Sequence, residues 1–378
     1  MNSNRRDLLL LLSLFVLVHL ALYVRGGIGT GIEATKYIYQ AELLLDGRFP
    51  SAPKYYYYLP IILLTAGAIK TGLGFGAVAL AQSVFSAFAL TLLYKGTLQV
   101  FGRQVAFMAS LLLCLFPPFF SWDLYLYSES IFISLSLVLY YTVCRNEKYS
   151  QRWLLATVAI LLLMFFTRPV GVLFAPALFV YSLFRTYLRP ADRYLTSGLF
   201  LLLLGVMFVF IDRILHGGED MNAMKPLKEE HVVCFVAQNP GGATLDLKYY
   251  DNGLRDIVYY VTHNPGHFAK LMGQRILSFF SMTRPWYSAA HNWAIRVFTV
   301  PVYVFFLIGL VGLFRERRNL QLYLVALLLM YPLAITFQCD DWHARFTMPV
   351  LPAICVLAAC GFSETWKRMR KYRLEKGN

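Results

Sequence analysis

Charged side chains are scarce in this chain of 378 residues. Only 15% of the residues are Asp, Glu, Lys or Arg, whereas 58% are hydrophobic, and the mean hydropathy is +0.54. A soluble domain with so few charges could not keep its surface hydrated. The composition therefore predicts a polytopic membrane protein.

Further absences exclude other classes of protein. The sequence contains no glycine-rich phosphate loop, no low-complexity tail and no cysteine spacing typical of zinc sites. The net charge of +14 would suggest nucleic acid as the partner of a soluble protein. In a membrane protein, basic residues instead collect in short loops on one face, so we expect no nucleic-acid partner.

The six cysteines are scattered along the chain. Cys234 and Cys339 fall in two external loops of the topology derived below, where a disulfide between them is one alternative. The sequence leaves that pairing open. The other four lie in or beside hydrophobic runs, where cysteine is usually a small apolar filler: Cys114, Cys144, Cys355 and Cys360.

Hydrophobic runs long enough to span a bilayer recur along the chain. A hydrocarbon core of about 30 Å requires roughly 20 apolar residues in a helix. The first run, Leu8–Tyr23, lacks a small-residue cleavage pattern and is interpreted as a retained first helix. About ten spans are predicted, at 7–25, 77–98, 104–120, 124–144, 152–166, 169–187, 194–215, 291–314, 319–338 and 346–363.

The segment Leu59–Gly74 decides the topology. It is apolar but short, begins Leu-Pro and contains Lys70. If it does not cross, every short basic cluster and the basic tail lie on one side, as the positive-inside rule expects of the cytoplasm. We therefore expect an external juxtamembrane or re-entrant helix here, with both termini in the cytoplasm.

This topology divides the chain into three parts. Residues 1–215 form an N-terminal transmembrane module that includes the first external loop, 26–76. Residues 216–290 form one long external loop, in which an amphipathic helix is expected near Pro265–Phe280. Residues 291–378 hold the last spans and the basic tail.

Ionisable residues gather at the external ends of the predicted spans. Glu33, Glu129, Arg168 and Arg345 would all lie near one interface, and ionisable groups at membrane depth are functional candidates because burying them is costly. Carboxylates and arginines that face one cavity suit a reaction on a phosphate-linked lipid. A carboxylate can take the proton of an acceptor hydroxyl or amine, while arginine holds a phosphate leaving group.

Short motifs then follow one another in a recognisable order. They are Glu33-Ala34-Thr35-Lys36-Tyr37 with Ala41-Glu42-Leu43-Leu44-Leu45-Asp46-Gly47, Pro117-Pro118 with Ser128-Glu129-Ser130, Arg168-Pro169-Val170-Gly171, and Arg345-Phe346-Thr347-Met348-Pro349-Val350-Leu351-Pro352. In this combination the chain resembles the GT-C glycosyltransferases of family 39, which include protein O-mannosyltransferases and the lipid A aminoarabinose transferase. The resemblance spans most of residues 1 to 365.

The resemblance implies an all-α polytopic GT-C fold and a bacterial inner-membrane enzyme of cell-envelope glycan biosynthesis. It implies an inverting transfer of one sugar from a polyprenyl-phosphate donor to a lipid, glycan or protein acceptor. Glu33 falls where the family carries a catalytic aspartate and is predicted to be the base, although its side chain is one methylene longer. The predicted substrate-binding residues are Tyr37, Lys54, Glu129, Arg168, Asp341, His343 and Arg345.

Several alternatives stay open at individual residues. Glu129 could cap the helix that follows it, and Arg168 could pair with a buried carboxylate. Asp46 is a second candidate base. Asp340-Asp341-Trp342-His343 could bind a divalent cation, or form a solvated turn that pairs with Arg345. We assign no metal ligand and no cofactor.

Alternatives also remain for the protein as a whole. A member that binds the donor but is inactive is one. An O-antigen-type polymerase or ligase would use a polyprenyl-diphosphate donor and also has many spans and one long external loop. A non-enzymatic lipid or glycan transporter would show midplane charges and repeated halves, which the sequence lacks.

Overall fold

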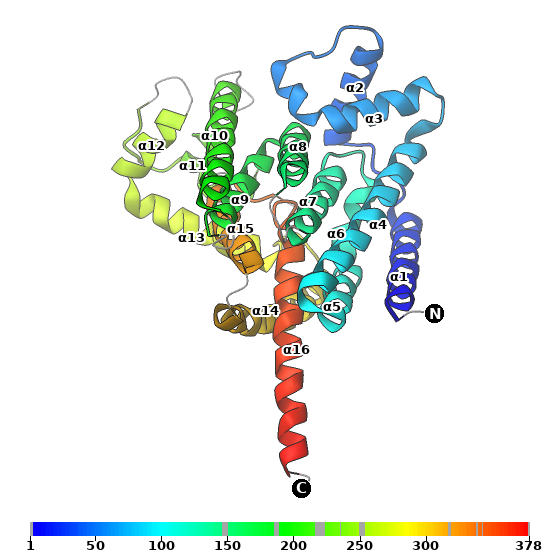
Figure 1. Ribbon diagram of the computed structural model, residues 1–378. Coiled ribbons are helices and arrows are strands. Elements are labelled where there is room, and N and C mark those ends of the chain that lie inside the picture. Colours follow the sequence, from blue (N-terminus) through cyan, green and yellow to red (C-terminus); the bar gives the residue numbers. More distant parts are fainter. Residues whose placement is uncertain are drawn as a thin grey trace.

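The chain is almost entirely helical in the computed structural model (Figure 1). The structure describes residues 3–145, 150–184, 189–215, 224–234, 236–248, 254–316, 319–337, 339–341 and 343–376. Within these ranges the only β-structure is three isolated bridges. The helices pack into a bundle from which the last helix projects.

The bundle contains long and short apolar helices. The helices long and apolar enough to cross a membrane are α1 (Ser3–Gly26), α4 (Gly74–Phe101), α10 (Pro190–Leu215) and α14 (Ala289–Glu316). A further span results if α5 (Arg103–Cys114) is joined to α6 (Pro117–Phe120) and η2 (Ser121–Leu124) across a bend of 75°. The remaining bundle helices are α7 (Glu129–Cys144), α8 (Gln151–Thr167), η3 (Pro169–Leu173), α9 (Phe174–Leu183), α15 (Asn319–Ile335) and α16 (Leu351–Lys376).

Each of the ten predicted ranges therefore contains a helix, but several of these helices are shorter than a full span. Proline explains the largest differences, because it removes a backbone donor and disfavours helix at the preceding residue. Pro117 follows the end of α5, Pro169 separates α8 from η3, and α16 begins only after Pro349. These breaks leave non-helical backbone where polar side chains can be presented.

The segment between α1 and α4 is helical. It forms α2 (Glu33–Leu45), η1 (Pro53–Tyr58) and α3 (Leu59–Lys70), and Figure 1 shows α2 and α3 above the end of the bundle. The 12 residues of α3 are too few to cross a bilayer. This length fits the expected non-crossing helix, whose place relative to a membrane stays a prediction. Glu33, which was expected in a loop, is the first residue of α2.

The long segment between α10 and α14 packs around its own small core. Its helices are α11 (Lys225–Lys228), α12 (Leu254–His263) and α13 (Pro265–Ser281), so the predicted amphipathic helix near Pro265–Phe280 is confirmed. Cys234 and Cys339 form a disulfide across 105 residues, which settles the pairing left open by the sequence. The small core consists of Met224, Leu227, Tyr260 and Leu271.

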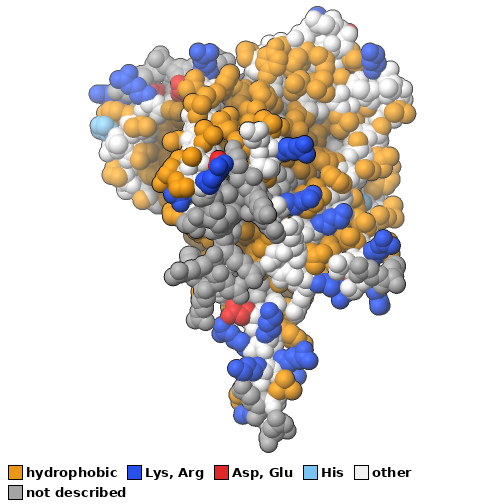
Figure 2. Space-filling model, viewed as in Figure 1, with side chains coloured by type: hydrophobic (Ala, Val, Ile, Leu, Met, Phe, Trp, Pro, Cys, Tyr) orange, Lys and Arg blue, Asp and Glu red, His pale blue; other side chains and the backbone are white. Residues whose placement is uncertain are grey.

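A close crossing of α14 and α16 positions the last helix. Gly309 on α14 and Gly361 on α16 approach so tightly that a Cβ on Gly309 would lie 2.0 Å from the Leu357 carbonyl oxygen. Small residues allow such contacts between helices in a membrane. Beyond this crossing, α16 projects away from the α2 and α3 end and carries Lys and Arg side chains (Figures 1 and 2).

Candidate active site

Arg345 is the centre of a largely buried charged cluster, in which the side chains of Arg345 and Glu33 are 14% and 26% exposed. Its Nη1 lies 2.8 Å from Oε2 of Glu33 and 3.1 Å from Oε1 of Glu129. Its Nε lies 2.7 Å from Oδ2 of Asp341. Since Glu33 and Arg345 are 312 positions apart, folding assembles this cluster from both ends of the chain.

Arg168 completes the cluster from the middle of the chain. Its Nη1 forms an ion pair with Oε1 of Glu129, which is only 1% exposed. The guanidinium groups of Arg168 and Arg345 also lie over the ring of Phe346, at 5.8 and 5.4 Å from its centroid. The cluster thus holds two arginines between three carboxylates, with one aromatic face beneath both cations.

Each charged side chain is presented by the end of a helix or by a break. Glu129 is the first residue of α7, and the Ser128 side chain that precedes it makes no capping hydrogen bond. Arg168 has extended backbone angles, φ −158° and ψ 135°, as expected before a proline. Glu129 therefore directs its carboxylate to the arginines, which favours the site role over the capping alternative.

A short backbone bridge holds the starts of α2 and α7 together. The Gly29 N–H donates to the Leu124 carbonyl at 2.8 Å, and the Leu126 N–H donates to the Gly29 carbonyl at 3.1 Å. A Cβ on Gly29 would lie 2.1 Å from the ring of Tyr125, so only glycine fits. This bridge helps to bring Glu33 and Glu129 to the same arginine.

The charges of the cluster determine the pKa of Glu33. Burial alone would raise this pKa, but the charge and hydrogen bond of Arg345, with the charge of Arg168, outweigh burial and hold it below the ordinary value of 4.5. Burial raises the pKa of Asp341 against the opposing charge of Arg345. The pKa of Arg345 lies well above its usual range because the nearby carboxylates outweigh its own burial.

Tyr37 and Tyr58 adjoin the charged cluster. Tyr37 lies one turn after Glu33 on α2, and its ring centroid is 5.2 Å from that of Tyr58. Burial raises the pKa of both phenols, so they stay neutral at physiological pH. Sequence analysis did not single out Tyr58 as a site residue, and its only signal was the run of four tyrosines.

Three other candidates have contacts elsewhere. The Lys54 amino group lies over the ring of Tyr55, 5.7 Å from its centroid. His343 packs edge-on against Trp122, with 5.9 Å between ring centroids, and burial lowers its pKa to about 4. Asp46 is exposed and pairs with Arg48 at 2.6 Å. None of these contacts joins the three residues to the Arg345 cluster, so their roles stay predictions.

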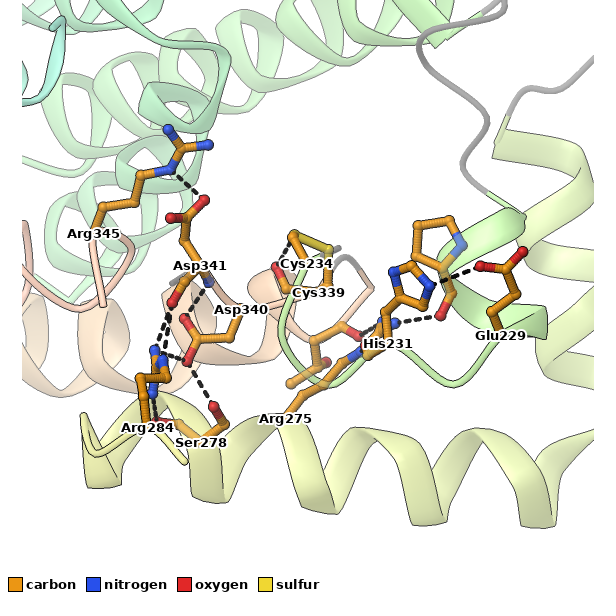
Figure 3. Close-up of a disulfide and its surroundings, with 12 residues drawn as sticks. Glu229, His231, Cys234, Arg275, Ser278, Arg284, Cys339, Asp340, Asp341 and Arg345 are labelled. Carbon is orange, nitrogen blue, oxygen red and sulfur yellow. Dashed lines mark hydrogen bonds and ion pairs between the residues drawn. A yellow bond between two sulfur atoms is a disulfide. The ribbon is translucent and has the colours of Figure 1, made fainter. Parts of the chain in front are cut away.

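The two neighbouring aspartates, Asp340 and Asp341, bind different arginines. Asp340 pairs with Arg284 at 2.6 Å, while Asp341 pairs with Arg345 (Figure 3). The predicted pairing with Arg345 is therefore correct, but the turn is buried instead of solvated, since the two aspartates are 0% and 1% exposed. In the described part of the chain, no three His, Cys, Asp or Glu side chains are grouped to hold a metal ion.

Arg284 supports this loop from below and was missed by sequence analysis. Its Nε and Nη2 donate to the main-chain carbonyl of Asp341, at 3.1 and 2.7 Å. Figure 3 shows Arg284 and Arg345 on opposite sides of the Asp340–Asp341 segment. No pattern in the sequence distinguishes Arg284 from the other basic residues of the long segment.

Comparisons with known proteins agree with this architecture. The profile of a family described as dolichyl-phosphate-mannose-protein mannosyltransferase matches residues 61–215, which include Glu129 and Arg168. ArnT from Cupriavidus metallidurans, solved bound to undecaprenyl phosphate, has a TM-score of 0.55 at 14% identity. The alignment covers 94% of this chain and 61% of ArnT.

A second solved structure shares the fold. AglB, an archaeal oligosaccharyltransferase from Archaeoglobus fulgidus in complex with an inhibitory peptide and a dolichol-phosphate, has a TM-score of 0.55 at 12% identity. The alignment covers 97% of this chain and 52% of AglB, so the chain spans only part of the length of either protein. A search among curated proteins found no match. The helical architecture and these two structures show that the chain has the GT-C fold, and the family profile over residues 61–215 supports its resemblance to glycosyltransferase family 39.

Proposed function

We propose that this protein transfers one sugar from a polyprenyl-phosphate donor to a lipid, glycan or protein acceptor. The observation that carries the proposal is the placement of Arg345 between Glu33 and Glu129, with Arg168 beside them. This arrangement combines a candidate base with cations that suit a phosphate. The two similar structures contain undecaprenyl phosphate and a dolichol-phosphate, which are both phosphates on long apolar chains.

The proposed reaction is a single in-line displacement. Glu33 accepts the proton of the acceptor hydroxyl or amine, whose oxygen or nitrogen then bonds to the anomeric carbon. The bond from that carbon to the lipid phosphate breaks, and the phosphate oxygen keeps the electron pair. Arg168 and Arg345 neutralise this leaving group. One displacement inverts the anomeric configuration and requires no covalent intermediate on the protein.

Arg345 also links donor binding to the basicity of Glu33. In this structure Arg345 binds Glu33 and lowers its pKa, which makes Glu33 a weaker base. A donor phosphate would compete with Glu33 for the same guanidinium. As the phosphate binds, the pKa of Glu33 rises, because burial is then less opposed. The base thus gains strength when the donor is in place.

The proposed setting is the extracytoplasmic face of a bacterial inner membrane, with both termini in the cytoplasm. The Cys234–Cys339 disulfide supports this orientation, because disulfides persist in oxidising compartments. The basic end of α16, on the opposite end of the bundle from α2 and α3, fits the cytoplasmic side. In this arrangement the proposed divisions are 1–215, 216–290 and 291–378, and the middle part would cover the site and help to select the acceptor.

The test is transfer by purified protein in lipid, supplied with radiolabelled polyprenyl-phosphate sugars and candidate acceptors. Glu33→Gln keeps the shape of the side chain but cannot accept the proton, so we expect transfer to fall by about 100- to 10,000-fold. Glu33→Asp restores the aspartate found in the similar family and should retain transfer.

The matched control is Glu42→Gln, which changes an exposed carboxylate on the same helix and should leave transfer unchanged. Full activity in Glu33→Gln would contradict the role of Glu33. Transfer only from polyprenyl-diphosphate donors would favour the polymerase or ligase alternative, and no transfer from any donor would contradict the proposed function.

A further inference from the structure

The neighbouring aspartates Asp340 and Asp341 differ in how many of their carboxylate oxygens accept hydrogen bonds from the protein. Oδ2 of Asp340 accepts hydrogen bonds from Ser278 at 2.8 Å and Arg284 at 2.6 Å. Its Oδ1 accepts the main-chain N–H of Asp341 at 2.7 Å. Both oxygens of Asp340 are therefore occupied, as expected of a buried structural carboxylate.

Asp341 is equally buried, but only one of its two carboxylate oxygens contacts a partner. Its Oδ2 lies 2.7 Å from Nε of Arg345, while its Oδ1 has no hydrogen-bond partner among the described residues. The Arg345 Nε–H is likewise without an aligned acceptor, so this contact is an ion pair and not a hydrogen bond. A buried acceptor, Asp341 Oδ1, and a buried donor, Arg345 Nε–H, thus lie close together, and neither forms a hydrogen bond.

We propose that Asp341 Oδ1 and Arg345 Nε–H together bind one hydroxyl of the donor's sugar. A hydroxyl both donates and accepts, so one group can donate to Asp341 and accept from Arg345. Leaving buried polar groups unpaired is costly, and a ligand that satisfies them recovers that cost. This inference rests on the proposed function and specifies which end of the donor the pair recognises.

The geometry assigns the sugar, and not the phosphate, to Asp341. Nη1 of Arg345 and the Arg168 guanidinium both contact Glu129, so two cations are available there to a phosphate that displaces this carboxylate. Only one arginine side chain pairs with Asp341. The two ends of the Arg345 guanidinium would then bind adjacent parts of one donor, the phosphate through Nη1 and the sugar through Nε. Glu33 remains available for the acceptor.

The experiment measures binding to the full-length protein in lipid nanodiscs. The probes are undecaprenyl phosphate and undecaprenyl phosphate carrying mannose, glucose or galactose. For wild-type protein we expect at least one glycosylated probe to bind about 10-fold more tightly than undecaprenyl phosphate, as for a charge-assisted hydrogen bond. In Asp341→Asn that gain should fall to less than about threefold, because an amide N–H₂ can replace the acceptor oxygen.

The binding of undecaprenyl phosphate itself provides the internal control. Asp341→Asn should bind this lipid at least as tightly as wild type, because one carboxylate no longer competes for Arg345. Glu229→Gln, which changes a carboxylate that contacts His231 outside the cluster, should retain the sugar-dependent gain. Derivatives of the preferred sugar that each lack one hydroxyl should identify a single position whose loss affects wild type but not Asp341→Asn.

Three results would overturn the inference. They are no gain for any sugar in wild type, an unchanged gain in Asp341→Asn, and equal weakening of glycosylated and bare lipid in that variant. The last result would mean that Asp341 acts only through Arg345. Sugar-dependent binding without transfer would contradict the proposed function but support this subsite, and failure of undecaprenyl phosphate to bind would contradict both.

Discussion

Two neighbouring aspartates of one buried loop, Asp340 and Asp341, each pair with a different arginine and differ in their contacts. Arg284 and Asp340 are 0% and 1% exposed and bind each other, the loop backbone and Ser278. The Asp341 side chain is also 1% exposed, but that of Arg345 is 14% exposed. Arg345 is shared with two further carboxylates, and Asp341 keeps one oxygen without a hydrogen bond. The two aspartates are equally buried and both are ion-paired, so the proposed scaffold pair and the proposed site pair differ in how completely the aspartate oxygens are hydrogen-bonded.

The largest effect is expected for Arg345→Lys. Lysine keeps the charge but loses the planar fork that reaches Glu33, Glu129 and Asp341 together. Transfer should fall by at least about 100-fold, as when one preorganised donor is removed from a charge-stabilising site. Initial rates of sugar transfer measure the loss of activity, and thermal unfolding in detergent measures stability. The unfolding temperature should change little.

The matched substitution, Arg284→Lys, should give the reverse pattern. It leaves the Asp341 carbonyl and part of Asp340 without their buried donors. We expect the free energy of unfolding to fall by about 3 kcal/mol, with transfer per folded molecule near that of wild type. If Arg284→Lys loses transfer while its stability is unchanged, the division into scaffold and site is wrong.

The disulfide should behave as part of the scaffold. Cys339 immediately precedes Asp340, and the Cys234 N–H also donates to the Asp340 carbonyl at 2.7 Å. Replacing both cysteines with serine should lower the free energy of unfolding by about 2 kcal/mol, since the backbone contacts remain. Transfer per folded molecule should stay within about threefold of wild type. A larger loss of transfer at unchanged stability would mean that the disulfide helps to position Arg345 and Asp341.

The smallest expected effect is a displacement of the pH profile. A base is active when deprotonated, so activity is present above the pKa of Glu33 and is lost as the pH falls through it. Because the fold lowers this pKa, the acidic limb of kcat/KM should lie below pH 4.5, the ordinary value. The acidic limb of kcat should lie higher, because donor phosphate draws Arg345 away.

Arg345→Gln tests the cause of this displacement. Without the opposing charge, burial dominates and the pKa of Glu33 should rise, which moves the acidic limb of kcat/KM to higher pH. Residual transfer measured from pH 4 to 8, in protein shown to stay folded across that range, gives the profile. An unchanged acidic limb would mean that Glu33 is not the titrating base.

The sequence predicted more of the fold than of the site's internal geometry. Hydropathy located a helix in each of the ten ranges, because burial in lipid depends on local composition. It did not predict that Pro117, Pro169 and Pro349 leave several of them short. Charge asymmetry predicted that Leu59–Gly74 does not cross, and the 12 residues of α3 are consistent with that prediction.

At the site, the sequence indicated that Glu33, Glu129, Arg168 and Arg345 would lie near one interface, and the structure brings them together. It could not assign partners, because a contact across 312 positions leaves no local pattern. For the same reason Arg284 and Asp340 were not recognised as a structural pair. Whether a buried oxygen is satisfied depends on neighbours from distant segments and is visible only in three dimensions.

The long sequence separation between Glu33 and Arg345 also determines when the cluster can form during synthesis of the chain. A chain is made from its N-terminus, so Glu33, Glu129 and Arg168 enter the membrane well before Arg345 is synthesised. Until then Glu129 has only Arg168 as an ion-pair partner in the cluster, Glu33 lacks the Arg345 guanidinium, and the Cys234–Cys339 bond cannot form. Assembly of the cluster is thus coupled to insertion of the final helices, because a chain that ends before Arg345 lacks the group that joins Glu33 to Glu129.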